Sequence, residues 1–235
     1  MAVPLAISSV TLQRPTVEEG LLAEEGLLEM VCQGELSLGW LAWSPRDRGL
    51  VMPRRHERLA DFPEARARLA ERGWPVRFRA TGGTPVPQSP QVINVALAQR
   101  CRVGGSAAHL EWGYHRLGDP WCDWLGHLGV ADADLGPVAG SYCDGRFNVR
   151  IAGRKLVGTA QRWRRVRGCR DMALLVHGAM QVEGDPAELV AVVNDFQAGI
   201  GDPMRFRAER HIALREAIPG FQPETLDTLL ARYRG

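Results

Sequence analysis

The chain has 235 residues, with 29 lysine and arginine residues against 27 aspartate and glutamate residues and a formal net charge of +2. Because positive and negative side chains are nearly equal in number, the net charge gives no indication of nucleic-acid binding. The hydrophobic share of 45% and the charged share of 24% are those of globular domains. A chain of this length can bury a full core without disulfides or metals.

The cysteines and the N-terminus predict a cellular setting. There are five cysteines, an odd number, and none form a CxxC pair. The N-terminus lacks the basic start and long apolar run of a signal peptide. No segment reaches the roughly 18 apolar residues of a membrane span. We therefore expect free thiols, a cytoplasmic location, and neither a membrane nor a nucleic-acid partner.

The first elements in chain order are a helix, a strand and a second helix. Thr16 and Glu19 have the spacing of a capping box, which predicts a helix over residues 16–32. Alternating apolar residues predict a strand over 36–43. A short helix is expected over 63–72, because a glycine follows it directly.

The middle of the chain predicts two strands and a broken helix. Residues 74–80 have the composition of a strand that runs into Gly82-Gly83, and residues 92–98 are expected to form its returning partner. The pattern over 107–128 is helical, with an interruption at Asp119-Pro120, because proline disfavours helix in the residue before it.

The last third predicts a hairpin, a buried strand and two helices. Residues 147–152 alternate, Gly153 marks a turn, and a returning strand begins at Lys155. A buried strand follows over 171–182, and Asp185-Pro186 is a strong helix start. A final amphipathic helix is expected over 223–233. No regular βαβ period appears, so we expect an α+β fold of mixed or antiparallel sheets flanked by helices.

Two motifs have both a functional and a structural interpretation. Gly82-Gly83 follows a strand and can offer N–H groups to a carbonyl or phosphate, but a plain hairpin turn is equally consistent. His177-Gly178 ends a buried run, where a histidine either faces a cleft or lies satisfied in the core. No metal site is expected from the spaced residues His109, His115, Cys122 and His127, which contain no tight ligand pair.

Cys143 precedes Lys155 by twelve residues in a turn-prone segment. A buried thiol with a purely structural role is the alternative to a reactive pair. If residues 143–152 were one extended strand, the thiol would lie roughly 25 Å from the turn at Gly153. The two side chains can meet only if the chain bends at Asp144-Gly145. In contact, the ammonium would lower the pKa of the thiol and favour attack on an acyl carbonyl.

At this point the residues resemble a known family. "GSYCDGRFNVRIAGRKLVGTAQRWRR" (140–165), with "RATGGTPVPQSPQVINVALA" (79–98) and "HGAM" (177–180), is similar to the biotin/lipoate protein ligase catalytic superfamily of lipoate–protein ligases and octanoyltransferases. The resemblance covers roughly residues 16–200. The cysteine of "GSYC" and the following "GRK" are most similar to the amidotransferase-type octanoyltransferase branch.

The resemblance implies a single catalytic domain over 1–235 without an accessory C-terminal domain. It implies that Cys143 is an acyl-accepting nucleophile and that Lys155 holds the acyl carbonyl. It also implies acyl transfer from a carrier such as a glycine cleavage H protein to a lipoyl domain, with no cofactor. The implied substrate contacts are Arg79, Thr81, Gly82, Gly83, Asn148, Gly158, Thr159, Ala160, His177 and Gly178.

Two alternatives stay open. An ATP-dependent lipoate ligase would use ATP and magnesium and leave Cys143 a bystander. Against it, Gln88 stands where such ligases have a histidine, and Phe147-Asn148 where they have Asn-Asp. The third hypothesis is an idle homologue that only binds carrier proteins. In each case an acidic carrier would suit the arginines that follow Lys155, although a solvated basic face is equally consistent; these are Arg162, Arg164, Arg165, Arg167 and Arg170.

Overall fold

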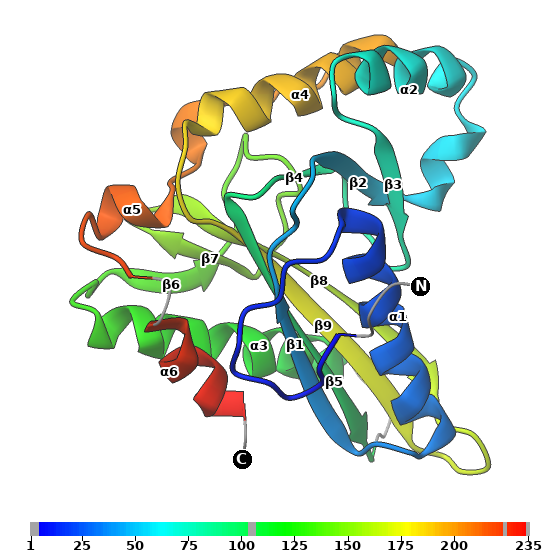
Figure 1. Ribbon diagram of the computed structural model, residues 1–235, viewed down its shortest axis with the longest axis vertical. Helices are drawn as coiled ribbons and strands as arrows, with labels where there is room; N and C mark the ends of the chain where they lie inside the picture. The colour runs from blue at the N-terminus through cyan, green and yellow to red at the C-terminus, as the bar shows by residue number, and fades with distance from the viewer. Residues whose placement is uncertain (1–4, 103–106, 223–224, 234–235) are drawn as a thin grey trace.

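The computed structural model describes residues 5–102, 107–222 and 225–233, which fold around two sheets (Figure 1). The larger sheet has six strands in the order β1-β5-β9-β8-β7-β6, and the smaller has three in the order β3-β2-β4. The expected α+β class is confirmed. The strands are β1 (Leu38–Trp43), β2 (Gly49–Pro53), β3 (Val76–Arg79), β4 (Val86–Gln88), β5 (Val92–Cys101), β6 (Ala133–Gly136), β7 (Asn148–Ile151), β8 (Arg154–Arg165) and β9 (Met172–Gln181). The helices are α1 (Val17–Gln33), α2 (Phe62–Glu71), α3 (Ala107–His127), α4 (Pro186–Gly199), α5 (Leu214–Ala217) and α6 (Leu226–Leu230).

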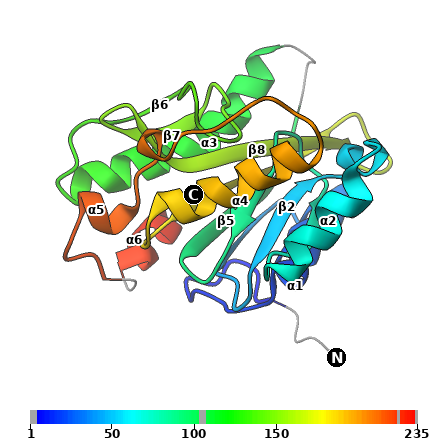
Figure 2. The ribbon, with the colours of Figure 1, turned by 90° about the horizontal axis from the view of Figure 1, so that it is seen from above.

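The large sheet separates two hydrophobic layers. All its neighbouring strands are antiparallel, and β5 pairs with β9 along its full length. Because side chains alternate along a strand, Leu174 and Val176 of β9 join the core beneath α3, whereas Ala173 and Leu175 pack with α1. The two helices lie on opposite sides of the sheet (Figure 2).

Helix α3 differs from the expectation of a break at Asp119-Pro120, because it is continuous with Pro120 inside it. Proline removes one helical hydrogen bond, but Leu117, Trp121 and Trp124 are almost completely buried and fix the helix against the sheet. The hydroxyl of Tyr233 donates to the carbonyl of Leu117 at 2.9 Å. Tertiary packing therefore outweighs the local preference.

The small sheet corrects the expected pairing of the middle strands. β3 pairs in parallel with β2, and β2 pairs antiparallel with β4. The strand over 92–98 is not the return of β3; it is β5, which joins β1 and β9. Its first seven residues are all buried, because β5 has a paired strand on each side and packed side chains on both faces. Helices α2 and α4 pack over the outer side of the small sheet (Figure 1).

The helix ends follow the expected capping patterns more closely than the C-terminal helix does. The capping box of Thr16 and Glu19 begins α1, and Asp185 caps α4. The helix expected over 223–233 is shorter, since α6 gives way to a 3₁₀ turn at Ala231–Tyr233. Pro223 and Glu224, where it was expected to begin, lie outside the described residues.

Candidate active site

The segment before β7 brings the thiol of Cys143 back toward Lys155. β7 begins only at Asn148, so residues 143–147 are not part of a strand. The expected bend is present, but not at Gly145. Cys143 itself adopts the left-handed conformation with φ 50°, while Gly145 is not among the residues with positive φ. A non-glycine residue in this conformation is strained and concentrates at functional sites.

The loop is held by its own polar groups. The carboxylate of Asp144 accepts the N–H of Val138 at 2.6 Å, and the side chain of Asn148 donates to the carbonyl of Gly145 at 2.7 Å. Asn148 has no exposed surface. Asn148 therefore supports the loop from within the protein, and the substrate contact expected for it stays a prediction.

Lys155 lies buried against the backbone of this loop. Its Nζ atom donates to the carbonyls of Tyr142 at 2.5 Å and Cys143 at 2.9 Å. An ammonium has three donors, so one remains for a ligand. Gly158 lies three residues beyond Lys155 on the same strand. A Cβ atom there would lie 2.9 Å from Lys155 Cε, so a glycine leaves room for the lysine side chain. Twelve residues of chain thus close into a direct contact.

The ring of Tyr142 supports the lysine from below. Lys155 Nζ lies 5.2 Å from the centroid of the Tyr142 ring. The ring of His211 stacks on the Tyr142 ring, with the two centroids 4.2 Å apart. Burial lowers the pKa of His211 to about 3, and the positive charge of Lys155 lowers it too. His211 is therefore neutral and adds no competing charge behind the ammonium.

The Gly82-Gly83 loop contacts the thiol from the other side. A Cβ atom on Gly83 would lie 2.5 Å from Cys143 Sγ, and Gly83 has φ +101°. The next residue, Thr84, accepts the backbone N–H of Cys143 at 2.7 Å through its hydroxyl oxygen. Both the close approach and the positive φ require glycine here, so the loop is more than a hairpin turn.

Arg79 anchors this loop and adds a second positive charge. The guanidinium is buried and donates to the carbonyls of Val51 at 2.8 Å, Gly82 at 2.7 Å and Thr84 at 2.8 Å. Its Nη2 atom lies 4.0 Å from Cys143 Sγ. Since carbonyls occupy its donors, Arg79 acts on the thiol and the loop, whereas the sequence predicted a contact with substrate.

The charges around the thiol favour its ionised form. Burial raises the pKa of Cys143. The charges of Lys155 and Arg79 and the hydrogen bond with Thr84 outweigh this effect, so the pKa lies below its ordinary value. Burial lowers the pKa of Lys155 to about 8, against the opposing effect of the Cys143 thiolate. These contacts therefore favour a thiolate–ammonium pair over the neutral thiol and amine.

A pocket of about 410 Å³, part of it open to solvent, leads away from the thiol. It lies between the large sheet, α1 and the small sheet, and Cys143 and Arg79 stand at one side of it. Gly158, Thr159 and Ala160 of β8 form another wall, and the substrate contacts expected for them stay predictions. Gly82 and Gly83 line the adjoining mouth, together with Cys143. The pocket has the mainly apolar lining with a few polar groups that is typical of small-molecule sites.

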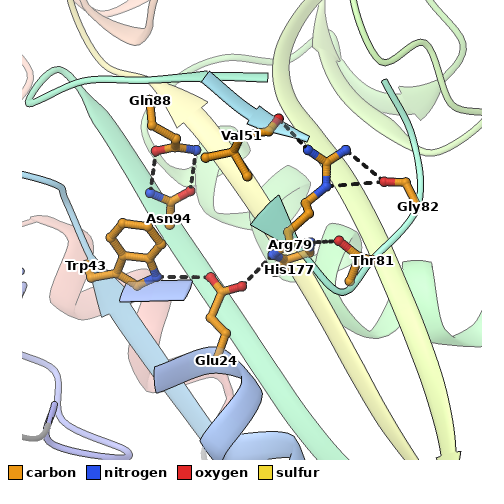
Figure 3. A network of polar contacts seen from close by, with 9 residues as sticks. All are labelled: Glu24, Trp43, Val51, Arg79, Thr81, Gly82, Gln88, Asn94 and His177. Carbon is orange, nitrogen blue, oxygen red and sulfur yellow. Dashed lines mark hydrogen bonds and ion pairs between the residues drawn. The ribbon is translucent and has the colours of Figure 1, made fainter. Parts of the chain in front are cut away.

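A buried polar network lines the pocket (Figure 3). Glu24 of α1 accepts from Trp43 Nε1 at 3.0 Å with one oxygen, and its other oxygen lies 2.7 Å from His177 Nδ1. His177 Nε2 lies 2.8 Å from the hydroxyl of Thr81. With Glu24 ionised, His177 carries a proton on Nδ1. Glu24 was not predicted, although a glutamate on the apolar face of a helix is a readable signal.

Gly178 does not share the position of His177. Its Cβ would meet side chains of Val157 and Leu117, so it faces the core under α3 and not the pocket. The alternation of a strand places His177 and Gly178 on opposite faces. Gly178 is not among the residues that line the pocket and its substrate contact stays a prediction, whereas His177 lines the pocket.

The other histidines and the arginines have separate environments. His115 bonds to Asp119, and His127 to the carbonyl of Asp123. Among the described residues, no group of three His, Cys, Asp or Glu side chains has the arrangement of a metal site. Arg162 donates to the carbonyl of Ala80 beside the loop, and Arg164 pairs with Glu29; the exposed remainder are Arg165, Arg167 and Arg170.

The family follows from comparison with known proteins. A family model described as the lipoyl protein ligase A/B catalytic domain matches residues 43–222. The chain belongs to this family. The expected superfamily and the expectation of a transferase enzyme are thereby confirmed. No described helix in this lipoyl protein ligase A/B catalytic domain is long and apolar enough to cross a membrane.

Several relatives of this catalytic domain have a curated description. An uncharacterized protein of Cupriavidus necator is 35% identical over 206 residues, which cover 83% of this chain and 79% of that protein. The octanoyl-[GcvH]:protein N-octanoyltransferase of Kyrpidia tusciae is 38% identical over 156 residues, covering 63% of this chain and 51% of that enzyme. The chain thus spans about half the length of that octanoyltransferase.

Solved structures confirm the fold. A lipoate-protein ligase A bound with ATP matches with a TM-score of 0.66 at 16% identity, covering 94% of this chain and 82% of that one. A putative lipoate protein ligase of T. acidophilum with bound lipoic acid matches with a TM-score of 0.63 at 15% identity, with the same coverage. The lipoyl protein ligase A/B catalytic domain therefore has the architecture expected from its sequence.

Proposed function

We propose that the protein is an acyltransferase that moves an octanoyl or lipoyl group between lysine side chains of carrier proteins through a thioester on Cys143, without ATP. The observation that carries the proposal is the buried Cys143 at the side of a pocket, with its thiol 4.0 Å from Arg79 and its backbone carbonyl held by Lys155. Relatives named octanoyl-[GcvH]:protein N-octanoyltransferases support the substrate class.

The first half-reaction is attack of the Cys143 thiolate on the carbonyl of an acylated lysine. The Sγ–C bond forms, and the carbonyl oxygen becomes an oxyanion. The third N–H of Lys155, which the loop carbonyls leave unused, is the natural donor to that oxygen. When the C–N bond breaks, the amine of the donor lysine takes up one proton from solvent and leaves, and the acyl group remains on the sulfur.

The second half-reaction reverses the first with a different amine. The lysine of the acceptor domain attacks the thioester carbonyl, loses a proton, and the C–S bond breaks to restore the thiolate. A low thiol pKa makes Cys143 a good leaving group in this step. The reaction exchanges one amide for another, so its energy balance needs no nucleotide.

The pocket accommodates the acyl chain in this scheme. Its wall is apolar at Leu21, Val51 and Val86. Water excluded from such a site strengthens the electrostatic contacts at the carbonyl. The protein partners of the reaction are carriers of the glycine cleavage H or lipoyl-domain kind, by analogy with the named relatives.

The proposal is tested by incubating the purified protein with an octanoylated H-type carrier, with and without ATP, followed by intact-protein mass spectrometry. The expected result is one octanoyl group on Cys143 without ATP, which passes to an added unmodified lipoyl domain. Cys143→Ala should abolish both signals, whereas Cys169→Ala, at an exposed cysteine, should retain them.

Two results would contradict the proposal in different ways. Octanoylation of the lipoyl domain from added free octanoate that requires ATP and survives Cys143→Ala would indicate a ligase that works through an acyl-adenylate. Tight binding of the carrier without transfer, with or without ATP, would indicate a carrier-binding protein.

A further inference from the structure

Two cavities meet at a single side chain of α1. Beside the pocket lies a surface groove of about 780 Å³, part of it open to solvent, bounded by α1, β3 and α2. Among the described residues that line either cavity, Leu21 is common to both. The side chain of Leu21 therefore stands between the pocket next to Cys143 and this groove.

Leu21 occupies this position as part of a small apolar cluster. It packs with Val17 of the same helix and Val51 of β2, and it is 8% exposed. Its neighbour Leu22 is 61% exposed and lines the groove but not the pocket. The groove side carries further apolar surface from Val76 and Phe78. The other described side chains that line the groove are charged, so a chain that passed Leu21 would meet apolar surface only at Leu22, Val76 and Phe78.

The polar side chains in the pocket wall are fixed by hydrogen bonds to their own neighbours. Glu24 is held by Trp43 and His177, as Figure 3 shows. Gln88 and Asn94 form two reciprocal amide hydrogen bonds at 2.9 and 3.0 Å. Moving either group would leave buried polar atoms without partners, which is costly. Leu21 has only van der Waals contacts to lose.

We infer that Leu21 is the end wall of the acyl pocket and sets the longest acyl chain that the enzyme accepts. This rests on the proposed function, since it assumes that the pocket holds the acyl chain. Saturated chains are the ligands concerned, because their methyl end prefers the apolar Val17–Leu21–Val51 cluster to the polar network. A smaller residue at this position joins the pocket to the groove and admits longer chains.

The test measures acylation of Cys143 directly. Acyl-N-acetylcysteamine thioesters with saturated chains of 6 to 14 carbons are mixed with the protein, and the rate of mass gain on Cys143 is followed. The thiolate displaces the N-acetylcysteamine thiolate, so the assay needs neither carrier nor ATP. Each buried methylene is worth about fourfold in affinity, so Leu21→Ala should raise the decanoyl-to-octanoyl rate ratio by roughly tenfold or more.

Two further variants make the outcome specific. Leu21→Phe keeps an apolar side chain but extends the wall into the pocket, and it should shift the preference toward hexanoyl. Leu22→Ala changes the groove without touching the wall, and it should keep the wild-type profile. Thermal melting of each variant shows that the fold is intact.

An unchanged chain-length profile in both Leu21→Ala and Leu21→Phe, with folding retained, would overturn the inference. If octanoyl thioester labels wild-type Cys143 and the profile shifts as expected, but no transfer occurs from an acylated carrier, the wall assignment stands and the carrier function fails. If no thioester labels Cys143 in any variant, the acyl pocket itself is rejected.

Discussion

Gly83 lies so close to Cys143 that a Cβ atom on the glycine would come within 2.5 Å of the thiol sulfur. The loop that follows β3 and the loop that precedes β7 are therefore in direct contact, although 60 residues separate these two positions in the chain. Arg79 and Thr84 fasten the contact from both sides.

Replacing Gly83 with alanine should damage both stability and acyl transfer. The φ of +101° and the clash with Sγ require the loop to move, at a cost of roughly 1–3 kcal/mol in the free energy of unfolding. Gly82→Ala is the matched control, because a Cβ there meets nothing within 4 Å. Urea unfolding and octanoylation of Cys143 measure the two effects. Equal behaviour of the two variants would refute the close contact.

Replacing Lys155 with glutamine should raise the pKa of the Cys143 thiol. The lysine charge is the largest effect that lowers this pKa, and without it the effect of burial is less opposed. The midpoint of the pH dependence of iodoacetamide alkylation at Cys143 should move upward. The rate of acyl transfer should fall by about 10²–10³-fold, the usual cost of losing an oxyanion donor. Alkylation with an unchanged midpoint would show that Lys155 does not stabilise the thiolate.

The pH dependence of transfer should fall on both sides. The burial-lowered pKa of Lys155, about 8, means that its ammonium is present below that pH and is lost as the pH rises through it. On the acid side, protonation of Cys143 removes the nucleophile. Wild-type activity measured from pH 5 to 10 should decline on the alkaline side near pH 8. Activity constant up to pH 10 would contradict a role for the charged lysine.

Glu24 should tolerate glutamine better than leucine. Glu24→Leu leaves Trp43 Nε1 and His177 Nδ1 without their acceptor, at a cost of about 2–4 kcal/mol in stability. In Glu24→Gln, the amide oxygen still accepts from Trp43, and the amide NH₂ donates to His177 once the ring proton moves to Nε2. Its cost should be below about 1.5 kcal/mol in urea unfolding. Equal costs for the two variants would contradict the network.

Added salt should raise the KM for an acidic carrier. Arg162 lies beside the Gly82-Gly83 loop and Arg165 is exposed on the same strand. Screening of such exposed charges weakens encounter with an acidic partner. Arg162→Gln should raise the KM at low salt and flatten its salt dependence, whereas Arg58→Gln, in the 3₁₀ turn after β2, should not. A KM that does not respond to salt would leave these arginines as a solvated face.

The sequence predicted the elements with strong local signals. The capping box at Thr16, the helix start at Asp185 and the hairpin before Lys155 depend on neighbours in the chain, so local rules suffice. The pairing of β5 depends on distant strands, and local composition does not determine it. For the same reason the prediction of a break at Pro120 was wrong. The burial of Trp121 and Trp124 stabilises the helix by more than the proline destabilises it.

The candidate site was predicted in part for similar reasons. Cys143 and Lys155 were found from their motif, but the bend was expected at Gly145 because glycine usually takes positive φ. The strained residue is Cys143 itself, held by Thr84 and by contacts to Lys155 that no spacing rule describes. Glu24 escaped notice since its partner His177 lies 153 positions away.

That last hydrogen bond has a consequence for how activity arises during folding. It joins the first helix to the last strand of the large sheet, so the pocket wall closes only after nearly the whole chain has collapsed. A partly folded chain lacks both the enclosed hydrocarbon site and the low-pKa nucleophile. During refolding, the rate at which Cys143 becomes reactive toward an octanoyl thioester therefore measures how fast the pocket and the strands around it reach their native structure.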